Sequence, residues 1–511
     1  ATPETRYSTP ELLALEQRIV TRAAARRGTA TATVPRPVVD RVVAARPWLS
    51  DEQLAAVHRL TGSGDGVAVV VGRAGSGKTS MLGAAREAWE AAGIPVAGVA
   101  LAARAALELH NGAGLRATTI DRLLLDVQRP GEGLAPGGVL VVDEAGMVGT
   151  RTLARLMDLA DTSDTTVVLV GDHHQLPEIE AGGAFAGLVN RLPVIELTEN
   201  RRQHETWERD ALDELRDGDI ETAVATYGEH GRLVVADTVE AVREQLVGDW
   251  WQAVEEQGAD AVMIAARRVD IEDLNLRARQ RIDAAGGLGK RAVEAAGRDF
   301  RIGDRILCLR NHRSVGVLNG TRGTVTDVDT RARAITFVRD DTDEQVVIPS
   351  LYLDAGWVDH GYAITAHKAQ GLTCEATFVL ADDATYREWG YVALSRGRTS
   401  NRLYLVEEPG DPDPPDDPTH PRVLQTDQRT PDERLAADLR RSHRQAMALD
   451  HLDDTSSDGG SARVVAHAAE FDPPTYITSI LGERPTGSAQ RRAWRDAVVA
   501  IETYRTGHGV T

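Results

Sequence analysis

The sequence predicts an α/β protein with two parallel sheets and a small antiparallel β-barrel inserted into the second. Short apolar runs alternate with helical segments from Leu49 onward, which is typical of parallel strands joined by helical crossovers. After a mainly helical stretch at 205–257, the strand pattern restarts at 261–266. Between 298 and 355 the pattern changes to short alternating strands separated by turn residues, which indicates the inserted barrel.

The length of the chain also indicates several domains. Its 511 residues are too many for one core and suggest about three or four domains. We expect a helical lead, a first α/β domain, a second α/β domain split by the insert, and an acidic Pro-rich linker with a C-terminal tail. The predicted bounds are 1–48 for the lead, 49–197 for the first domain, 198–297 and 356–409 for the second domain, 298–355 for the insert, and 410–511 for the linker and tail.

Composition excludes several classes of protein. The net charge of −19 argues against a protein that coats DNA by positive charge alone, although a few groups in a narrow channel could still hold a strand. The polar N-terminus and the lack of an apolar run of about 18 residues predict no signal peptide and no membrane partner. Two cysteines without a CxxC pair favour a reducing, cytoplasmic location without structural zinc.

The segment GRAGSGKT at 72–79 matches the phosphate-loop pattern G-x4-G-K-[ST]. It follows an apolar strand and opens a helix, a context that disfavours the alternative of a ligand-free glycine turn. Backbone N–H groups of such a loop point at phosphate oxygens, while Lys78 would reach the β/γ-phosphates of ATP and Thr79 would offer a hydroxyl to Mg²⁺. The nucleotide-binding residues predicted here are Gly72, Gly75, Ser76, Gly77, Lys78 and Thr79.

Two further strands are expected to bring polar side chains to the same site. VLVVDE places Asp143 and Glu144 at a strand end, where Asp143 would hold Mg²⁺ and Glu144 would polarise the attacking water. GDHHQLPE follows the next strand, and Gln175 is placed to sense the γ-phosphate. A metal site at His173 and His174 is disfavoured, because adjacent side chains in a loop point in different directions and no third ligand is near.

Two arginine-containing segments complete a nucleotide site shared between domains. They are LTENRRQ at 197–203 and YVALSRGR at 391–398, from which we select Arg202 and Arg396 as catalytic residues. Hydrolysis between two domains requires cations from the far domain to stabilise the transition-state charge. A solvated surface role is the alternative for a single arginine, but the surrounding motifs favour the catalytic role.

The segment HGYAITAHKAQGLT at 360–373 is dense in polar groups for a loop after an apolar strand. Its residues Thr365, His367 and Lys368 could contact a DNA phosphate, while Gly371 would lie at the nucleotide. ATTID at 117–121 offers the hydroxyls of Thr118 and Thr119 to phosphate oxygens, with helix capping as an equal alternative.

Together these motifs resemble superfamily 1 helicases of the 5′→3′ class, the RecD-like group, over residues 49–408. The resemblance implies two RecA-like domains, an SH3-like barrel as the insert, and an adenine-reading role for Gln53 in LSDEQ. It also implies ATP with Mg²⁺, and single-stranded DNA or single-strand/duplex junctions as partners. Relatives build a strand-splitting pin at the position of 122–138, where this chain has only a short Gly/Pro-rich segment.

Within that group, YREWGYVALSRGR and the tail LGERPTGSAQRRAWRDAVVAIETYR most resemble the helicase half of actinobacterial conjugative relaxase-helicases, the TraA or TrwC type of the MobF family. We therefore expect a motor acting in conjugative plasmid transfer, in contact with a relaxase domain or the conjugation machinery. A RecD-like repair helicase and an ATP-gated regulator that does not move along DNA are the alternatives.

Overall fold

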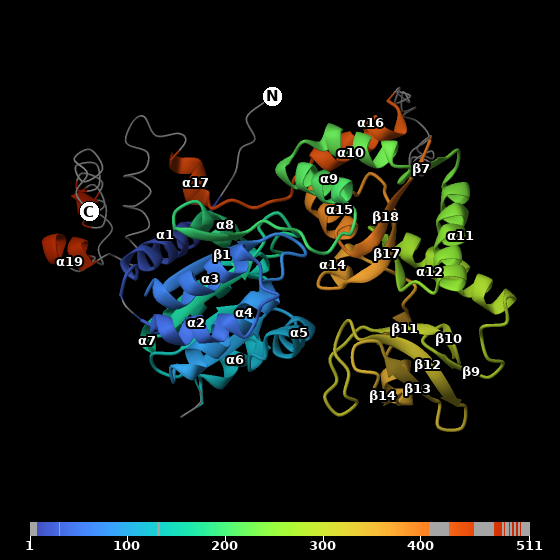
Figure 1. Ribbon diagram of the computed structural model, residues 1–511, viewed down its shortest axis with the longest axis horizontal. Coiled ribbons are helices and arrows are strands. Elements are labelled where there is room, and N and C mark those ends of the chain that lie inside the picture. Colours follow the sequence, from blue (N-terminus) through green and yellow to red (C-terminus); the bar gives the residue numbers. More distant parts are fainter. Residues whose placement is uncertain are drawn as a thin grey trace.

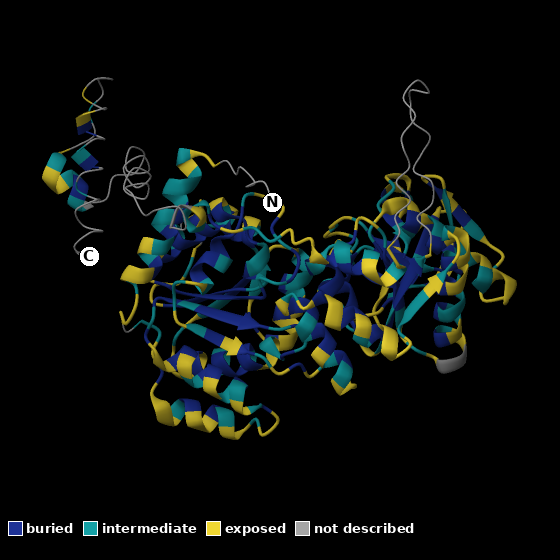
Figure 2. Cartoon of the chain, turned by 90° about the horizontal axis from the view of Figure 1, so that it is seen from above, coloured by how far each residue is buried: buried dark blue, intermediate teal, exposed yellow. Residues whose placement is uncertain are grey.

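The computed structural model describes residues 8–29, 31–129, 133–407, 429–453, 475–482 and parts of 485–501. It contains two separate parallel sheets and an antiparallel sheet inserted in the second domain, which confirms the predicted α/β class (Figure 1). The strands of both parallel sheets are largely buried, whereas exposed residues gather on the outer helices (Figure 2). Among the described residues, no helix has both the length and the apolar character needed to cross a bilayer.

The first domain is a six-stranded parallel sheet in the order β3-β2-β4-β5-β1-β6. Strand β1 lies inside the sheet between β5 and β6, so the loop that follows it emerges near the ends of its neighbours. The strands are β1 (Val67–Gly72), β2 (Val96–Ala100), β3 (Ala117–Thr119), β4 (Val139–Val142), β5 (Thr166–Gly171) and β6 (Val194–Leu197). The helices are α1 (Pro10–Ala25), α2 (Arg36–Ala44), α3 (Asp51–Gly62), α4 (Lys78–Ala91), α5 (Ala103–Ala113), α6 (Ile120–Asp126), α7 (Thr150–Thr162) and α8 (Ala184–Val189), with a short 3₁₀ turn η1 (Ala145–Met147).

The second domain has a five-stranded parallel sheet in the order β16-β8-β17-β18-β7. Strands β8 and β17 in the middle of this sheet are almost fully buried, as expected for strands covered on both faces. The strands are β7 (Leu233–Ala236), β8 (Ala261–Ala265), β16 (Ala363–Ile364), β17 (Cys374–Leu380) and β18 (Gly397–Val406). The helices are α9 (Thr206–Asp217), α10 (Ile220–Glu229), α11 (Val239–Gln257), α12 (Arg268–Ala284), α14 (Ala366–Ala369) and α15 (Arg387–Leu394).

The insert is an antiparallel sheet in the order β14-β13-β12-β11-β15, accompanied by a two-stranded β9–β10 hairpin. Its own apolar core includes Phe300, Phe337 and Tyr352. Antiparallel pairing extends beyond 298–355 on both sides, because Val293 pairs with Phe300 and Val358 pairs with Cys308. Its elements are β9 (Ala292–Ala295), β10 (Arg298–Arg301), β11 (Arg305–Cys308), β12 (Arg322–Asp329), β13 (Ala334–Arg339), β14 (Gln345–Ile348), α13 (Ser350–Asp354) and β15 (Val358–His360).

Part of the expected tail packs against both domains. Helix α16 (Pro431–Arg440) lies on α10 and α15 of the second domain, and the chain then crosses to α17 (Ala448–Asp453) beside α1 (Figure 1). We call residues 441–450 the interdomain strap. Its Ser442 hydroxyl donates to Glu388 at 2.6 Å, its Gln445 amide donates to the Glu178 carbonyl at 2.8 Å, and its Met447 is fully buried in the first domain. The Pro/Asp segment 410–421 lies outside the described residues, as does most of the helix expected at 473–505, of which α19 (Thr475–Leu481) is described.

A buried carboxylate anchors the far end of the strap. The Glu16 side chain on α1 accepts hydrogen bonds from the backbone N–H groups of Ala448 and Leu449, both at 3.1 Å. Glu16 is 1% exposed, and burial raises its pKa to about 7, with Asp450 raising it further and Arg191 opposing the rise. The anchor is therefore sensitive to protonation.

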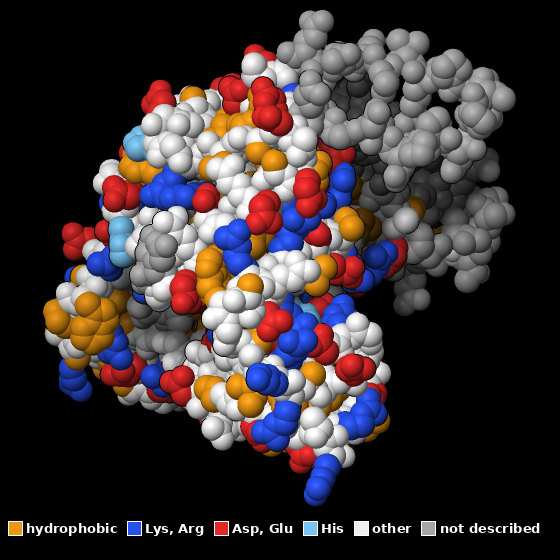
Figure 3. All heavy atoms as spheres, turned by 90° about the vertical axis from the view of Figure 1, so that its right-hand side faces the viewer, with side chains coloured by type: hydrophobic (Ala, Val, Ile, Leu, Met, Phe, Trp, Pro, Cys, Tyr) orange, Lys and Arg blue, Asp and Glu red, His pale blue; other side chains and the backbone are white. Residues whose placement is uncertain are grey.

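The outer face of the second domain and insert carries mixed charge. Arginine and carboxylate side chains are interspersed over this face (Figure 3). On α12, Arg277 pairs with Asp273 and Arg281 pairs with Glu244 of α11, both at 2.7 Å.

Candidate active site

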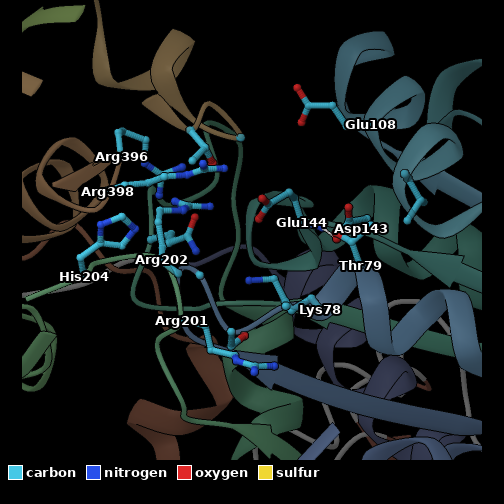
Figure 4. A pocket seen from close by; sticks show the side chains of 18 residues that line it. Lys78, Thr79, Glu108, Asp143, Glu144, Arg201, Arg202, His204, Arg396 and Arg398 are labelled. Atoms are coloured by element: carbon cyan, nitrogen blue, oxygen red, sulfur yellow. Dashed lines mark hydrogen bonds between the residues drawn. The ribbon is translucent and has the colours of Figure 1, made fainter. Parts of the chain in front are cut away.

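Most of the predicted nucleotide and catalytic residues meet in one cleft between the two domains (Figure 4), whereas Gln53 and Gly72 do not line it. The cleft has a volume of about 500 Å³. The first domain contributes the phosphate loop and the segments that follow β4 and β5. The second domain contributes arginines from the segment that precedes α9 and from the segment that follows α15. Its lining residues are Ala74, Gly75, Ser76, Gly77, Lys78, Thr79, Glu108, Leu109, Asp143, Glu144, Gln175, Arg201, Arg202, His204, Gly371, Thr373, Arg396 and Arg398.

The phosphate loop takes the conformation that its glycines allow. Gly75 and Gly77 have φ values of +77° and +72°, a region that other residues rarely adopt. A Cβ atom on Gly75 would lie 2.6 Å from the Cβ of Arg202, so this glycine also lets the interdomain connection approach the loop. Lys78 Nζ donates to the carbonyl of Gly72 at 2.8 Å, which places the ammonium over the loop where phosphate oxygens would lie.

Gln53 lies beside the loop and does not line the cleft. Its Nε2 donates to the Ser76 carbonyl at 3.0 Å, and its Oε1 accepts the N–H of Ser50 at 3.0 Å in a capping box at the start of α3. Gln53 is 2% exposed. An adenine contact from this side chain requires it to exchange one of these bonds, so its base-reading role stays a prediction.

The end of β4 brings two carboxylates into the cleft. Burial, together with the adjacent Glu144, raises the pKa of Asp143 to about 7, and Lys78 opposes the rise. Glu144 has a φ of +50°, which costs a non-glycine residue on the order of 1–3 kcal/mol and is typical of functional sites. Thr79 and Asp143 lie on the same side of the cleft (Figure 4) and offer the oxygen ligands that Mg²⁺ prefers, so these residues fit the ion.

Gln175 follows a buried ionic centre at the end of β5. Asp172 pairs with Arg216 of α9 at 3.5 Å, and Gln175 itself is 4% exposed and lines the cleft. The rings of His173 and His174 are half-buried, and burial lowers the pKa of both, to about 4 and about 3. Among the described residues, no group of three or more His, Cys, Asp or Glu side chains could hold a metal ion.

The two predicted arginines converge on the same residue of the second domain. Arg202 Nη1 donates to the Ser395 carbonyl at 2.8 Å, and Arg396 Nη2 donates to the Ser395 hydroxyl at 2.6 Å. Burial lowers the pKa of both guanidinium groups, and for Arg396 the proximity of Arg202 contributes further, to about 9. Two desolvated cations facing Glu144 and the phosphate loop form a site that favours an anion.

The residues predicted to contact DNA lie outside this cleft on both domains. Thr118 and Thr119 belong to β3, while Thr365, His367 and Lys368 lie at α14. The hydroxyls of Thr119 and Thr365 each accept a hydrogen bond at 3.2 Å from the backbone N–H three residues later, which is helix capping. His367 is exposed and Lys368 is half-buried, and burial lowers the pKa of Lys368. Their DNA contacts stay predictions.

Several lining residues were not selected from the sequence. Arg201 and Arg398 stand inside the two arginine segments, so their neighbours were a usable signal. Glu108, on α5, belongs to no motif, so no sequence signal marked it. It lies close to Gly371 of the second domain: a Cβ atom built on Gly371 would be 2.7 Å from Glu108 Oε2. The other lining residues missed are Ala74, Leu109, His204 and Thr373.

Comparison with known proteins adds the family. Residues 48–238 match the model of an AAA domain, and residues 360–406 match the UvrD-like helicase C-terminal domain. By these matches, the chain is similar to the RecD-like group of superfamily 1B helicases. It is 37% identical over 403 residues to the conjugal transfer protein TraA of Agrobacterium fabrum, an alignment covering 78% of this chain and 36% of TraA. It is 29% identical over 397 residues to the RecBCD subunit RecD of Mycolicibacterium smegmatis, covering 67% and 69% of the two chains.

This RecD-like chain spans 36% of the length of the TraA relatives that it matches. Among solved structures, it is similar to a Bacteroides Pif1 helicase in complex with ADP-AlF3 and single-stranded DNA, with 18% identity, a TM-score of 0.46, and coverage of 70% of this chain and 92% of that chain. The sequence matches to TraA and RecD confirm the resemblance to RecD-like helicases, and within them to TraA.

Proposed function

We propose that this chain is an ATP-driven translocase on single-stranded DNA that unwinds duplexes in the 5′→3′ direction. The observation that supports it best is the shared cleft, in which Lys78 and Glu144 of the first domain face Arg202 and Arg396 of the second. ATP held across such a boundary favours the closed arrangement of the two domains, and its hydrolysis removes that preference. Repeated closure and opening provides the motion that a translocase needs.

The residues predicted from the sequence take distinct roles in this proposal. Lys78 binds the β/γ-phosphates, Glu144 takes a proton from the attacking water, and Arg202 and Arg396 stabilise the charge that develops on the phosphoryl group. Mg²⁺, when held by Thr79 and Asp143, would neutralise phosphate charge. Gln175 would contact the nucleotide beside the γ-phosphate. Gly371 would contact it from the second domain, and Gln53 would contact the adenine base.

The strand would cross both domains. Thr118 and Thr119 on one side, and Thr365, His367 and Lys368 on the other, offer neutral and cationic donors to phosphates. The insert would form an SH3-like barrel that guides the strand near a single-strand/duplex junction. Direction follows from the β character of this insert, because 3′→5′ relatives usually carry a large helical insertion in the second domain.

The similarity to conjugal transfer protein TraA supports a role in conjugative DNA transfer in the cytoplasm, with a relaxase domain or conjugation machinery as partner. The similarity to RecD, which covers about two thirds of both chains, favours a repair helicase as the second candidate. The two candidates share the same motor and differ in the partner that loads it.

The test is an ATPase assay with and without single-stranded DNA, followed by unwinding of one duplex carrying either a 5′ or a 3′ tail. Stimulation by DNA and preferred unwinding of the 5′-tailed duplex, with weak activity on the 3′-tailed one, are expected, and Lys78→Ala is the inactive control. Hydrolysis without any response to DNA would instead indicate an ATP-gated regulator. Preferred unwinding of the 3′-tailed duplex would overturn the direction and leave the motor in place.

A further inference from the structure

The hydroxyl group of Tyr391 lies between the two domains and away from solvent. Tyr391 belongs to α15 of the second domain and is 2% exposed. Its oxygen accepts a hydrogen bond from the backbone N–H of Ala74, in the phosphate loop, at 3.1 Å. The same hydroxyl donates to Asp172 Oδ2, at the end of β5, at 3.3 Å. One side chain of the second domain therefore contacts two segments of the nucleotide site in the first.

Asp172 is held as a charged acceptor for this hydroxyl. Its side chain is fully buried, and its Oδ1 accepts the N–H of His174 at 3.0 Å and pairs with Arg216 Nη2 at 3.5 Å. Burial alone would raise the pKa of Asp172, but Arg216 and Lys78 hold it below the ordinary value. Because Arg216 comes from α9, the second domain holds Asp172 through two separate helices.

Arg396 lies just past the C-terminal end of α15 and is hydrogen-bonded to the last turn of that helix. The N–H of Ser395 donates to the carbonyl of Tyr391 at 3.1 Å, and Arg396 Nε donates to the carbonyl of Val392 at 2.8 Å. The guanidinium of Arg396 is thus attached to the same turn that bears the Tyr391 hydroxyl. A change in the distance between Tyr391 and Ala74 would move Arg396 relative to the phosphate loop.

We propose that Tyr391 is a positioning residue that sets Arg396 against the phosphate loop through its bonds to Ala74 and Asp172. This inference rests on the proposed hydrolysis at the shared cleft, but not on movement along DNA. When nucleotide shifts the loop, the Tyr391 hydroxyl transmits the shift to α15, and Arg396 follows. Tyr391 itself touches no reacting atom.

The first experiment is Tyr391→Phe, which keeps the ring and removes only the hydroxyl. The turnover number for ATP should fall roughly 10- to 100-fold, because a small displacement of a catalytic group has an effect of that size. The KM for ATP should stay within about twofold, since the loop contacts that bind ground-state nucleotide remain. Tyr386→Phe is the matched control: Tyr386 precedes the same helix, its ring stacks on His443 at 4.0 Å, and its turnover should equal that of the parent.

The second experiment is the double variant Tyr391→Phe with Arg396→Ala. If Tyr391 acts through Arg396, adding Tyr391→Phe to Arg396→Ala should leave the residual turnover within about twofold, because both changes remove the same interaction. Additive losses, or a parental turnover number for Tyr391→Phe alone, would overturn the inference. Thermal melting of each variant checks folding. Basal hydrolysis suffices as a readout, so a chain that hydrolyses ATP but fails to unwind DNA would refute the motor proposal and still test Tyr391.

Discussion

Replacing Arg396 with methionine should stabilise the ligand-free protein while it removes ATP turnover. The Arg396 guanidinium donates to two uncharged oxygens, the Val392 carbonyl at 2.8 Å and the Ser395 hydroxyl at 2.6 Å. Within the described part of the chain, Arg396 forms no ion pair with a carboxylate. A buried charge without an ion-pair partner is unfavourable until an anion arrives.

The size of this effect follows from the burial of the charge. Burial and the nearby Arg202 lower the pKa of Arg396 to about 9, well below the ordinary value of an arginine. At ~1.4 kcal/mol per pKa unit, this difference corresponds to about 5 kcal/mol against the charged form. The methionine variant loses two hydrogen bonds worth about 1 kcal/mol each and packs less well. We therefore expect it to be about 1–3 kcal/mol more stable than the parent without nucleotide.

The assay is thermal unfolding with and without Mg²⁺ and a non-hydrolysable ATP analogue, together with steady-state hydrolysis. The analogue should raise the melting temperature of the parent more than that of the variant, and turnover should fall ~10²–10⁴-fold. Arg398→Met is the control, because Arg398 lines the same cleft with a side chain that is 51% exposed. A ligand-free Arg396→Met protein that melts below the parent, or one with full turnover, would refute the reasoning.

Lys78→Ala should nearly abolish hydrolysis at an unchanged melting temperature, because the contact to the β/γ-phosphates is lost; turnover within roughly twofold of the parent would contradict the assignment. Glu144→Gln should bind ATP but hydrolyse it slowly, since the water-polarising carboxylate is lost; failure to bind in an equilibrium titration would make Glu144 structural. Glu16→Gln should alter the pH dependence of stability. With a folded pKa raised from 4.5 to about 7, Glu16 stabilises the protein below its unfolded pKa, and this contribution is lost as pH rises through 7. The melting temperature of the variant minus that of the parent should therefore increase from about pH 5 to about pH 8. A difference that stays constant over this range would contradict the raised pKa of Glu16.

The class of the fold and most of the cleft could be predicted because they depend on contiguous residues. A phosphate loop needs a buried strand, glycines and a helix in immediate succession, and 72–79 contains the signal within eight positions. Asp143 follows β4 directly and Gln175 lies four residues after the end of β5, and parallel strands deliver such residues to one edge of a sheet.

The extent of the insert and the packing of the tail could not be predicted in the same way. Strand β15 is three residues long and pairs with β11, about 50 residues earlier, so no local alternation marks it. The interdomain strap has no periodic pattern of its own. Its Met447 is buried by residues of α8 and its neighbours, which lie about 260 residues earlier in the chain.

The sequence by itself determined the two parallel sheets, the phosphate loop, the carboxylates at the strand ends and the arginines of the second domain, because each depends on local periodicity or on a short motif. Only the tertiary structure decided which of these side chains face one another. The Tyr391 hydroxyl is 317 residues from Ala74 and 219 residues from Asp172 along the chain. Its role depends on the distance between two domains, a quantity that packing sets and that no short segment of sequence contains.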